Sequence, residues 1–256
     1  MFELPSQPQS TSQILETGIQ LFKLCFFKVL PLALVDVVFK ILLHVTIPEL
    51  NSPEPAILAS AVMDSIIYLF FYLLLLLLLQ AAIFYRINAI MTQSDFGNLE
   101  ALLQGLKKLL PLFLATWLYY FLIGIGLFAL IVPGIFLAIA LAFFIPLLLF
   151  DNAPVFNSFK HSYQLVAGNW GRTVLILAFP FLFSISVGIF LTVIVENILN
   201  FSTTLAPEQI NEFLQLTYIT VDKLLNPLIY TFILVQYNDL KQRKKPFSPV
   251  NKQFIA

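Results

Sequence analysis

The longest uncharged stretch of this chain runs from Leu109 to Phe150, without a single Asp, Glu, Lys or Arg. As one continuous helix it would extend roughly 60 Å at about 1.5 Å per residue. The hydrocarbon core of a bilayer is only about 30 Å thick, so the stretch is long enough to cross it twice. The tripeptide Val132-Pro133-Gly134 near its middle favours a turn. We therefore expect a hairpin of two membrane-spanning helices.

The composition extends this expectation to the whole chain. Hydrophobic residues make up 59% of the 256 residues and charged residues 11%, against about half and about a quarter in soluble domains. A water-facing surface cannot be built from so few charges, so lipid must surround most of the chain. The other predicted spans are Val29–Ile47, Ser65–Phe84, Thr173–Val195 and Leu216–Val235. Together these patterns predict an all-α, polytopic protein with six spans in a single integral membrane domain, residues 1–256.

The distribution of basic residues predicts the orientation. If both termini are cytoplasmic, every Lys and Arg outside the spans lies on the cytoplasmic side, as the positive-inside rule requires. These residues are Lys23, Lys28, Arg86, Lys107, Lys108, Lys160, Arg172, Lys241, Arg243, Lys244, Lys245 and Lys252. Only Lys40 and Lys223 fall within predicted spans. We expect a multi-pass membrane protein with both termini in the cytoplasm.

A short amphipathic segment precedes each odd-numbered span. The three segments cover residues 10–27, 96–107 and 154–168, and helical spacing places their apolar residues on one face. The order Glu16, Gln20, Lys23 in the first recurs as Glu100, Gln104, Lys107 in the second, and Gln164 of the third aligns with Gln20. This predicts three copies of a surface helix followed by two spans, in repeat units of about 10–86, 95–150 and 154–238. A polar tail, 1–9, and a basic tail, 239–256, flank them. Such helices either fix the depth of each hairpin or form a cytoplasmic collar that senses or gates.

One stripe of ionisable residues lies inside a predicted span. Asp36, Lys40 and His44 are at positions i, i+4 and i+8 of the first span, so they share a helix face. Each charge in the bilayer centre costs about 2.5–3.5 kcal/mol, which makes such residues functional candidates. The alternative is a structural ion pair between Asp36 and Lys40. Further candidates lie near the outer ends of their spans, either lining a vestibule or as hydrated span ends: Asp64, Glu196, Asp222 and Lys223.

Other chemistry has little support. The single Cys25 excludes a disulfide within the chain, and the two histidines, His44 and His161, are predicted on opposite sides of the membrane. No nucleophile-elbow or phosphate-loop motif is present, so we expect no enzyme, no cofactor and no metal site. The net charge of zero offers no attraction for nucleic acid. The expected partner is membrane lipid, to which the basic segment Lys241–Lys245 is attracted; protein partners stay open and a homo-oligomer is compatible with the sequence.

A stretch between Val132 and Arg172 resembles a known family. It contains a Pro-Gly pair, a span that ends near a proline, and the segment from Ser158 to Arg172 with its Gly-Asn-aromatic end. The residues that carry the resemblance are Pro133, Gly134, Pro146, Ser158, Ser162, Leu165, Gly168, Asn169, Trp170 and Arg172. The stretch is similar to the YciC-like family of bacterial inner-membrane proteins and, more broadly, to the membrane domain attached to some glycerophosphodiester phosphodiesterases. The resemblance implies a multi-pass inner-membrane protein and a connection with lipid or envelope biology.

Two functional hypotheses follow. The first is a non-enzymatic multi-pass membrane protein in envelope or lipid homeostasis. The second is a small transporter that uses the Asp36–Lys40–His44 stripe, since polar groups near the bilayer centre and internal repeats are typical of transporters.

Overall fold

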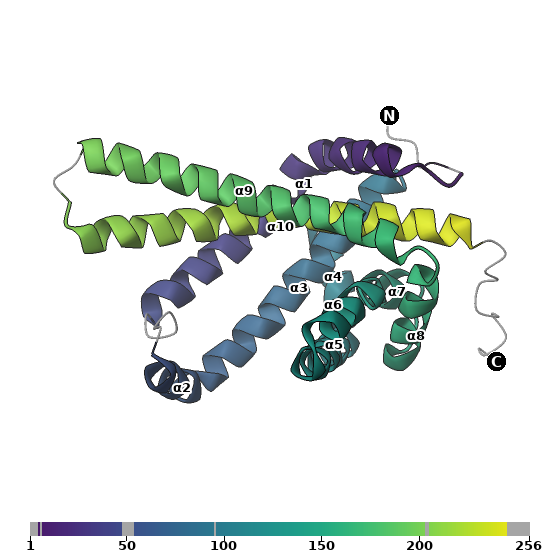
Figure 1. The fold of residues 1–256 in the computed structure, drawn as a ribbon, viewed down its shortest axis with the longest axis horizontal. Coiled ribbons are helices and arrows are strands. Elements are labelled where there is room, and N and C mark those ends of the chain that lie inside the picture. Colours follow the sequence, from purple (N-terminus) through teal and green to yellow (C-terminus); the bar gives the residue numbers. More distant parts are fainter. Residues whose placement is uncertain (1–4, 6, 48–53, 95, 203–204, 245–256) are drawn as a thin grey trace.

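The computed structural model describes residues 5, 7–47, 54–94, 96–202 and 205–244, and this part of the chain is helical without a strand. In chain order the helices are α1 Thr11–Thr46, α2 Pro55–Asp64, α3 Ile66–Met91, α4 Asn98–Lys107, α5 Leu109–Ala129, α6 Ile131–Ala140, α7 Phe144–Phe150, α8 Val155–Val166, α9 Trp170–Ser202 and α10 Pro207–Arg243 (Figure 1). The all-helical prediction is confirmed.

Several of these helices are suited to cross a membrane. Within the described residues, five segments are long and apolar enough: Ile66–Met91, Leu109–Ala129, Ile131–Phe150, Trp170–Phe201 and Pro207–Arg243. They correspond to the second to sixth predicted spans. The first predicted span, which contains Asp36 and Lys40, forms the later part of α1 and is not among the five. A multi-pass architecture is therefore supported by five segments, and the first predicted span, Val29–Ile47, stays a prediction.

The first amphipathic segment and the first predicted span form one helix. Ser10 caps α1: its side chain accepts a hydrogen bond from the backbone of Gln13, whose side chain in turn accepts one from the Ser10 N–H. No turn follows the amphipathic part, and Pro31 lies inside the helix. In Figure 1 the first part of α1 runs across the top of the molecule and the later part descends toward α2. A proline inside a helix removes one backbone hydrogen bond and favours a bend of this kind.

The predicted turn at Val132-Pro133-Gly134 is wrong. The chain reverses at Leu130, whose extended backbone (φ −168°, ψ 154°) separates α5 from α6. Pro133 lies in the first turn of α6, where its missing N–H costs nothing. Gly134 serves packing instead, because a Cβ there would lie 2.4 Å from the Leu127 side chain. A Cβ on Gly126 would likewise approach the Gly134 Cα to 2.9 Å, so the two glycines allow α5 and α6 to lie close together.

The segment Ile131–Phe150 is interrupted after α6. The backbone leaves the helix at residues 141–143, and Ser162 of α8, fully buried, spans the gap. Its hydroxyl accepts a hydrogen bond from the Phe143 N–H at 3.1 Å and donates one to the Ala140 carbonyl at 2.9 Å. Unsatisfied backbone groups are costly at membrane depth, and broken helices persist only where protein or water satisfies them. The Ser162 side chain therefore stabilises the interruption between α6 and α7.

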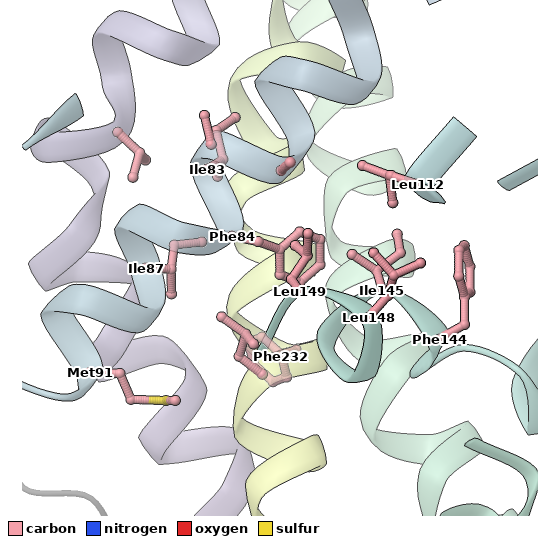
Figure 2. Packing of buried hydrophobic residues seen from close by; sticks show 14 of the residues in the cluster. Ile83, Phe84, Ile87, Met91, Leu112, Phe144, Ile145, Leu148, Leu149 and Phe232 are labelled. Carbon is pink, nitrogen blue, oxygen red and sulfur yellow. The ribbon is translucent and has the colours of Figure 1, made fainter. Parts of the chain in front are cut away.

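The buried core occupies one half of the helix bundle, which we call the core half. It unites α1 up to Val37, α3 from Leu77 onward, α7, the start of α9 and α10 from Leu228 onward. Figure 2 shows Phe84 of α3, Phe232 of α10 and Leu149 of α7 converging within it. This arrangement joins the first, middle and last parts of the chain.

We call residues 38–47, 54–76, 181–202 and 205–226 the splayed half. None of the large apolar side chains described there is buried. In Figure 1 the α9–α10 hairpin and the α1–α2–α3 segment diverge toward the left of the view. Apolar side chains that no part of the described chain covers need a non-aqueous partner.

The three amphipathic segments are helical in the structure: the first begins α1, and the others correspond to α4 and α8. Under the alignment of Gln20 with Gln164, the same positions are buried in the first and third copies: Ile14, Gly18 and Leu21 in α1, and Ser158, Ser162 and Leu165 in α8. The threefold repeat itself stays a prediction.

Helix α4 buries small residues and exposes large ones. Ala101 and Gly105 are buried, and a Cβ on Gly105 would lie 3.3 Å from Ala81 and Leu78 of α3. Three leucines of α4 point outward: Leu99 is 71% exposed, Leu103 52% and Leu106 55%. The leucines are thus available to a surface outside the chain.

Candidate functional site

The candidate site lies where the core half meets the splayed half. Asp36, only 6% exposed, is the last polar residue of α1 within the core. Its Oδ2 lies 3.9 Å from the Nζ of Lys223 on α10. The same ammonium lies 3.7 Å from Oδ2 of Asp222, whose side chain is 48% exposed. Lys223 is therefore shared between two carboxylates, one buried and one accessible.

The predicted ion pair between Asp36 and Lys40 is replaced by this arrangement. In the described part of the chain no direct salt bridge joins the two, although Lys40 interacts electrostatically with Asp36 and Asp222. The i, i+4 spacing favours pairing on an isolated helix, but α10 brings a lysine from a facing helix. His44, the third member of the stripe, lies two turns beyond Asp36 in the splayed half and has an interaction partner of its own.

Polar groups from α3 and α10 complete the surroundings of Asp36. Tyr72 of α3 is close enough to Asp36 and Asp222 to interact with both electrostatically. Gln80 of α3 hydrogen-bonds to the hydroxyl of Tyr230 of α10. Among the described residues, the Oδ1 atom of Asp36 has no hydrogen-bond partner. The site thus combines one incompletely satisfied buried carboxylate with Lys40, Asp222 and Lys223.

A cavity of about 550 Å³ adjoins this polar group in the splayed half. One wall comes from the end of α1, with Phe39, Leu43 and Thr46, and the other from the start of α3, with Tyr68, Tyr72 and Leu75. The volume is in the range of small-molecule sites, which are typically apolar with a few polar groups. Tyr72 lines the cavity and also interacts electrostatically with Asp36 and Asp222, so it connects the cavity with the charged residues.

A second polar cluster, which the sequence analysis missed, closes the opposite end of the bundle. Asp239 of α10 is 3% exposed. Its carboxylate accepts hydrogen bonds from the Gln9 backbone N–H at 2.7 Å and from Nε of Arg243 at 2.7 Å, and lies 3.4 Å from Nη2 of Arg172. Both guanidinium groups also donate to the Gln9 carbonyl. The segment before α1 is therefore fastened to α9 and α10.

Asp151, after α7, forms a third polar contact. Its carboxylate accepts a hydrogen bond from the Tyr237 hydroxyl at 2.7 Å and contacts Lys241 Nζ at 2.9 and 3.0 Å. Lys241 and Arg243, expected to attract anionic lipid, thus both bind acids of the chain itself. One sequence feature could have indicated these contacts. Asp151 and Asp239 are acids at span ends on the side that is predicted to carry the basic residues.

The residues that carry the family resemblance have structural roles. Ser162 supports the helix break, Leu165 is buried, and Pro146 is buried inside α7. The Ser158 hydroxyl donates to the Val155 carbonyl at 2.6 Å. Gly168 has a positive φ of 81°, a conformation that glycine adopts readily after a helix.

The end of this motif connects α8 to α9. The Asn169 carbonyl accepts hydrogen bonds from both the N–H and the hydroxyl of Thr173 at 2.9 Å. The Trp170 ring stacks on Phe136 of α6 with centroids 5.9 Å apart. Arg172 reaches Asp239, as described above.

The described residues contain no cluster of three or more His, Cys, Asp or Glu side chains arranged to hold a metal ion. Comparisons with protein-family models, with curated proteins and with solved structures gave no match to this chain.

Proposed function

We propose that this protein is a non-enzymatic, six-span protein of a bacterial inner membrane that binds a membrane lipid between α1 and α3 and acts in envelope lipid homeostasis. The observation that carries the proposal is the cavity of about 550 Å³ between these helices, whose lining residue Tyr72 interacts electrostatically with Asp36. An apolar cavity with charged groups at one end matches an amphiphile, which has an acyl chain and a polar headgroup.

In this proposal the first predicted span, Val29–Ile47, is the later part of α1 and also crosses the membrane. Two observations support it: its partner helices α3 and α10 are themselves long and apolar enough to cross a membrane, and its charged Asp36 has a partner on α10. Pairing inside the bundle lowers the cost of a charge at membrane depth. With both termini cytoplasmic, reporter fusions at Glu54 and Ala206 should report the outer side and a C-terminal fusion the inner side. A C-terminal reporter on the outer side would reject the six-span topology.

The three amphipathic segments lie along the cytoplasmic interface in this proposal. The exposed leucines of α4 support this, because an apolar face that no part of the described chain covers suits the acyl boundary of a membrane. The splayed half then faces the outer leaflet, from which a lipid enters the cavity laterally. The resemblance to the YciC-like family is in line with a role in lipid or envelope biology.

Lipid retention tests the proposed function. The full chain is purified in mild detergent and its bound phospholipid is quantified by native mass spectrometry. Leu75→Trp, which fills the cavity, should lower retention strongly. Leu114→Trp is the matched control, because Leu114 of α5 is 51% exposed and lies outside the cavity. Equal retention by the two variants and the unmodified protein would reject lipid binding in this cavity.

A second candidate is transport, which the buried Asp36–Lys223 pair favours. Ionisable residues near the middle of spans commonly mark substrate or proton pathways. Replacing both Asp36 and Lys223 with Leu removes the pair without leaving an isolated charge. If this double variant reaches normal membrane levels and still complements a deletion strain, transport through the pair is rejected.

A further inference from the structure

Helix α10 carries a polar face that leads through the splayed half to Asp36. Six polar residues lie within one face at helical spacing: Glu208, Glu212, Gln215, Asp222, Lys223 and Asn226. The salt bridge from Lys223 to Asp36 fixes the direction of this face, which points toward α1. Glu208, Glu212, Gln215 and Asp222 are all exposed.

This face is acidic overall. The face itself carries three acids, Glu208, Glu212 and Asp222, and one lysine, Lys223. A cleft with excess negative charge raises the local concentration of positively charged groups. The face therefore favours a ligand group that carries positive charge.

The two carboxylates at the end of this face have unused hydrogen-bonding capacity. Lys223 lies 3.9 Å from Asp36 and 3.7 Å from Asp222, whereas charge-assisted N–H···O bonds are about 2.7–2.9 Å long. The Asp36 Oδ1 atom, on a side chain that is 9% exposed, forms no hydrogen bond with the residues that the structure describes. A second donor beside the Lys223 ammonium would satisfy this atom.

We propose that the headgroup recognised here is the primary ammonium of an aminophospholipid, bound to Asp36 and Asp222 beside Lys223. A primary ammonium has three N–H donors, so it can hydrogen-bond to both carboxylates, whereas a quaternary ammonium has none. Lys40, which has no direct salt bridge in the described part of the chain, binds the phosphate of the same headgroup. One acyl chain occupies the cavity between α1 and α3. This assignment rests on the proposed lipid-binding function and names its ligand class.

A headgroup that carries both charges also suits the charge balance of the site. Two acids, Asp36 and Asp222, and two lysines, Lys40 and Lys223, act on one another at the site, so an anionic phospholipid would add a negative charge without a counter-charge. A zwitterionic headgroup with a primary ammonium adds no net charge and pairs each of its ends with an opposite charge. Lipids with an anionic or a choline headgroup are therefore the comparisons that test this headgroup assignment.

The test uses the purified full chain with phospholipids of identical acyl chains and three headgroups: ethanolamine, choline and glycerol. Retention of each is measured by native mass spectrometry. Loss of hydrogen bonds to a charged group corresponds to about tenfold in affinity, so the ethanolamine lipid should be retained about tenfold better than the choline lipid. Asp36→Asn and Asp222→Asn should each reduce this preference. Glu196→Gln, at an exposed acid on α9, is the matched control and should leave it unchanged.

The outcomes separate the two proposals. Equal retention of ethanolamine and choline lipids, preference for the glycerol lipid, or an unchanged preference in both Asp variants would overturn the headgroup assignment while lipid binding stands. Absence of any retained phospholipid would reject the proposed function itself. Asp222 is half exposed, so its variant tests the assignment even if Asp36→Asn does not fold.

Discussion

The backbone N–H of Gln9 donates a hydrogen bond of 2.7 Å to the carboxylate of Asp239, a residue 230 positions later in the chain. The same carboxylate lies between Arg172 and Arg243, and both guanidinium groups reach back to the Gln9 carbonyl. One buried acid thus connects the segment before α1 with the start of α9 and the end of α10. We infer that Asp239 stabilises the core half more than any exposed acid of the chain.

The first prediction concerns this acid. Asp239→Ala should lower the free energy of unfolding by about 3–5 kcal/mol, because it leaves two partly buried arginines without their shared partner. Thermal unfolding in detergent measures the effect. Asp64→Ala, at an exposed position on α2, should change stability by less than about 0.5 kcal/mol. Similar melting temperatures for the two variants would show that the Asp239 cluster contributes little.

The second prediction tests the support of the helix break. Ser162→Ala leaves the Phe143 N–H and the Ala140 carbonyl without their partner and should destabilise the protein by about 1–3 kcal/mol. Ser186→Ala is the control, because the exposed Ser186 hydroxyl donates only to the Leu182 carbonyl of its own helix. If both variants unfold at the same temperature, the break does not depend on Ser162.

The third prediction concerns the close contact of α5 and α6. A Cβ at Gly134 would lie 2.9 Å from the Leu127 backbone nitrogen, which cannot move aside as a side chain can. Gly134→Ala should therefore cost about 1–3 kcal/mol through overpacking. A Cβ at Gly124 meets nothing within 4 Å, so Gly124→Ala should be neutral or slightly stabilising. The opposite order of stabilities would contradict the packing of this hairpin.

The fourth prediction concerns Cys25, which is fully buried and whose thiol donates to the Leu21 carbonyl at 2.7 Å. Burial raises the pKa of this thiol from an ordinary 9.0 to about 12. The unfolded chain then loses the thiol proton first, so stability falls as the pH rises through this window, by about 1.4 kcal/mol per pH unit. Cys25→Ala should remove this part of the pH dependence. An identical slope in both proteins between pH 9 and 11 would show that the thiol does not contribute.

Much of the architecture was predictable, because long apolar runs dictate helices whatever their tertiary neighbours. The position of the turn between α5 and α6 was not predictable. Pro133 and Gly134 have strong local turn preferences, but in the structure they lie inside α6, and Gly134 allows close helix packing. The partner of Asp36 was equally hidden: local spacing favours Lys40, and only the packing of α1 against α10 brings Lys223 closer. Asp239 and Gln9 lie at opposite ends of the chain, so no pattern in the sequence could pair them.

The fifth prediction follows from that change of partner. Lys223→Leu should lower membrane accumulation more than the double variant with Asp36→Leu does, because the single change leaves a buried carboxylate without its cation. Lys40→Leu should have a smaller effect than Lys223→Leu. Quantitative immunoblotting of membrane fractions gives the comparison. A larger loss for Lys40→Leu would restore the pairing expected from the sequence.

Photo-crosslinking from inside the cavity tests the central claim most directly. A benzophenone amino acid replaces Leu43, which lines the cavity between α1 and α3, or Leu114, which lies on the exposed face of α5. Each protein is purified in detergent to remove loosely associated lipid, irradiated, and analysed by intact mass spectrometry. Lipid binding in the cavity predicts a phospholipid adduct from position 43 and none from position 114. Equal adducts from both positions, or none from position 43, would contradict it.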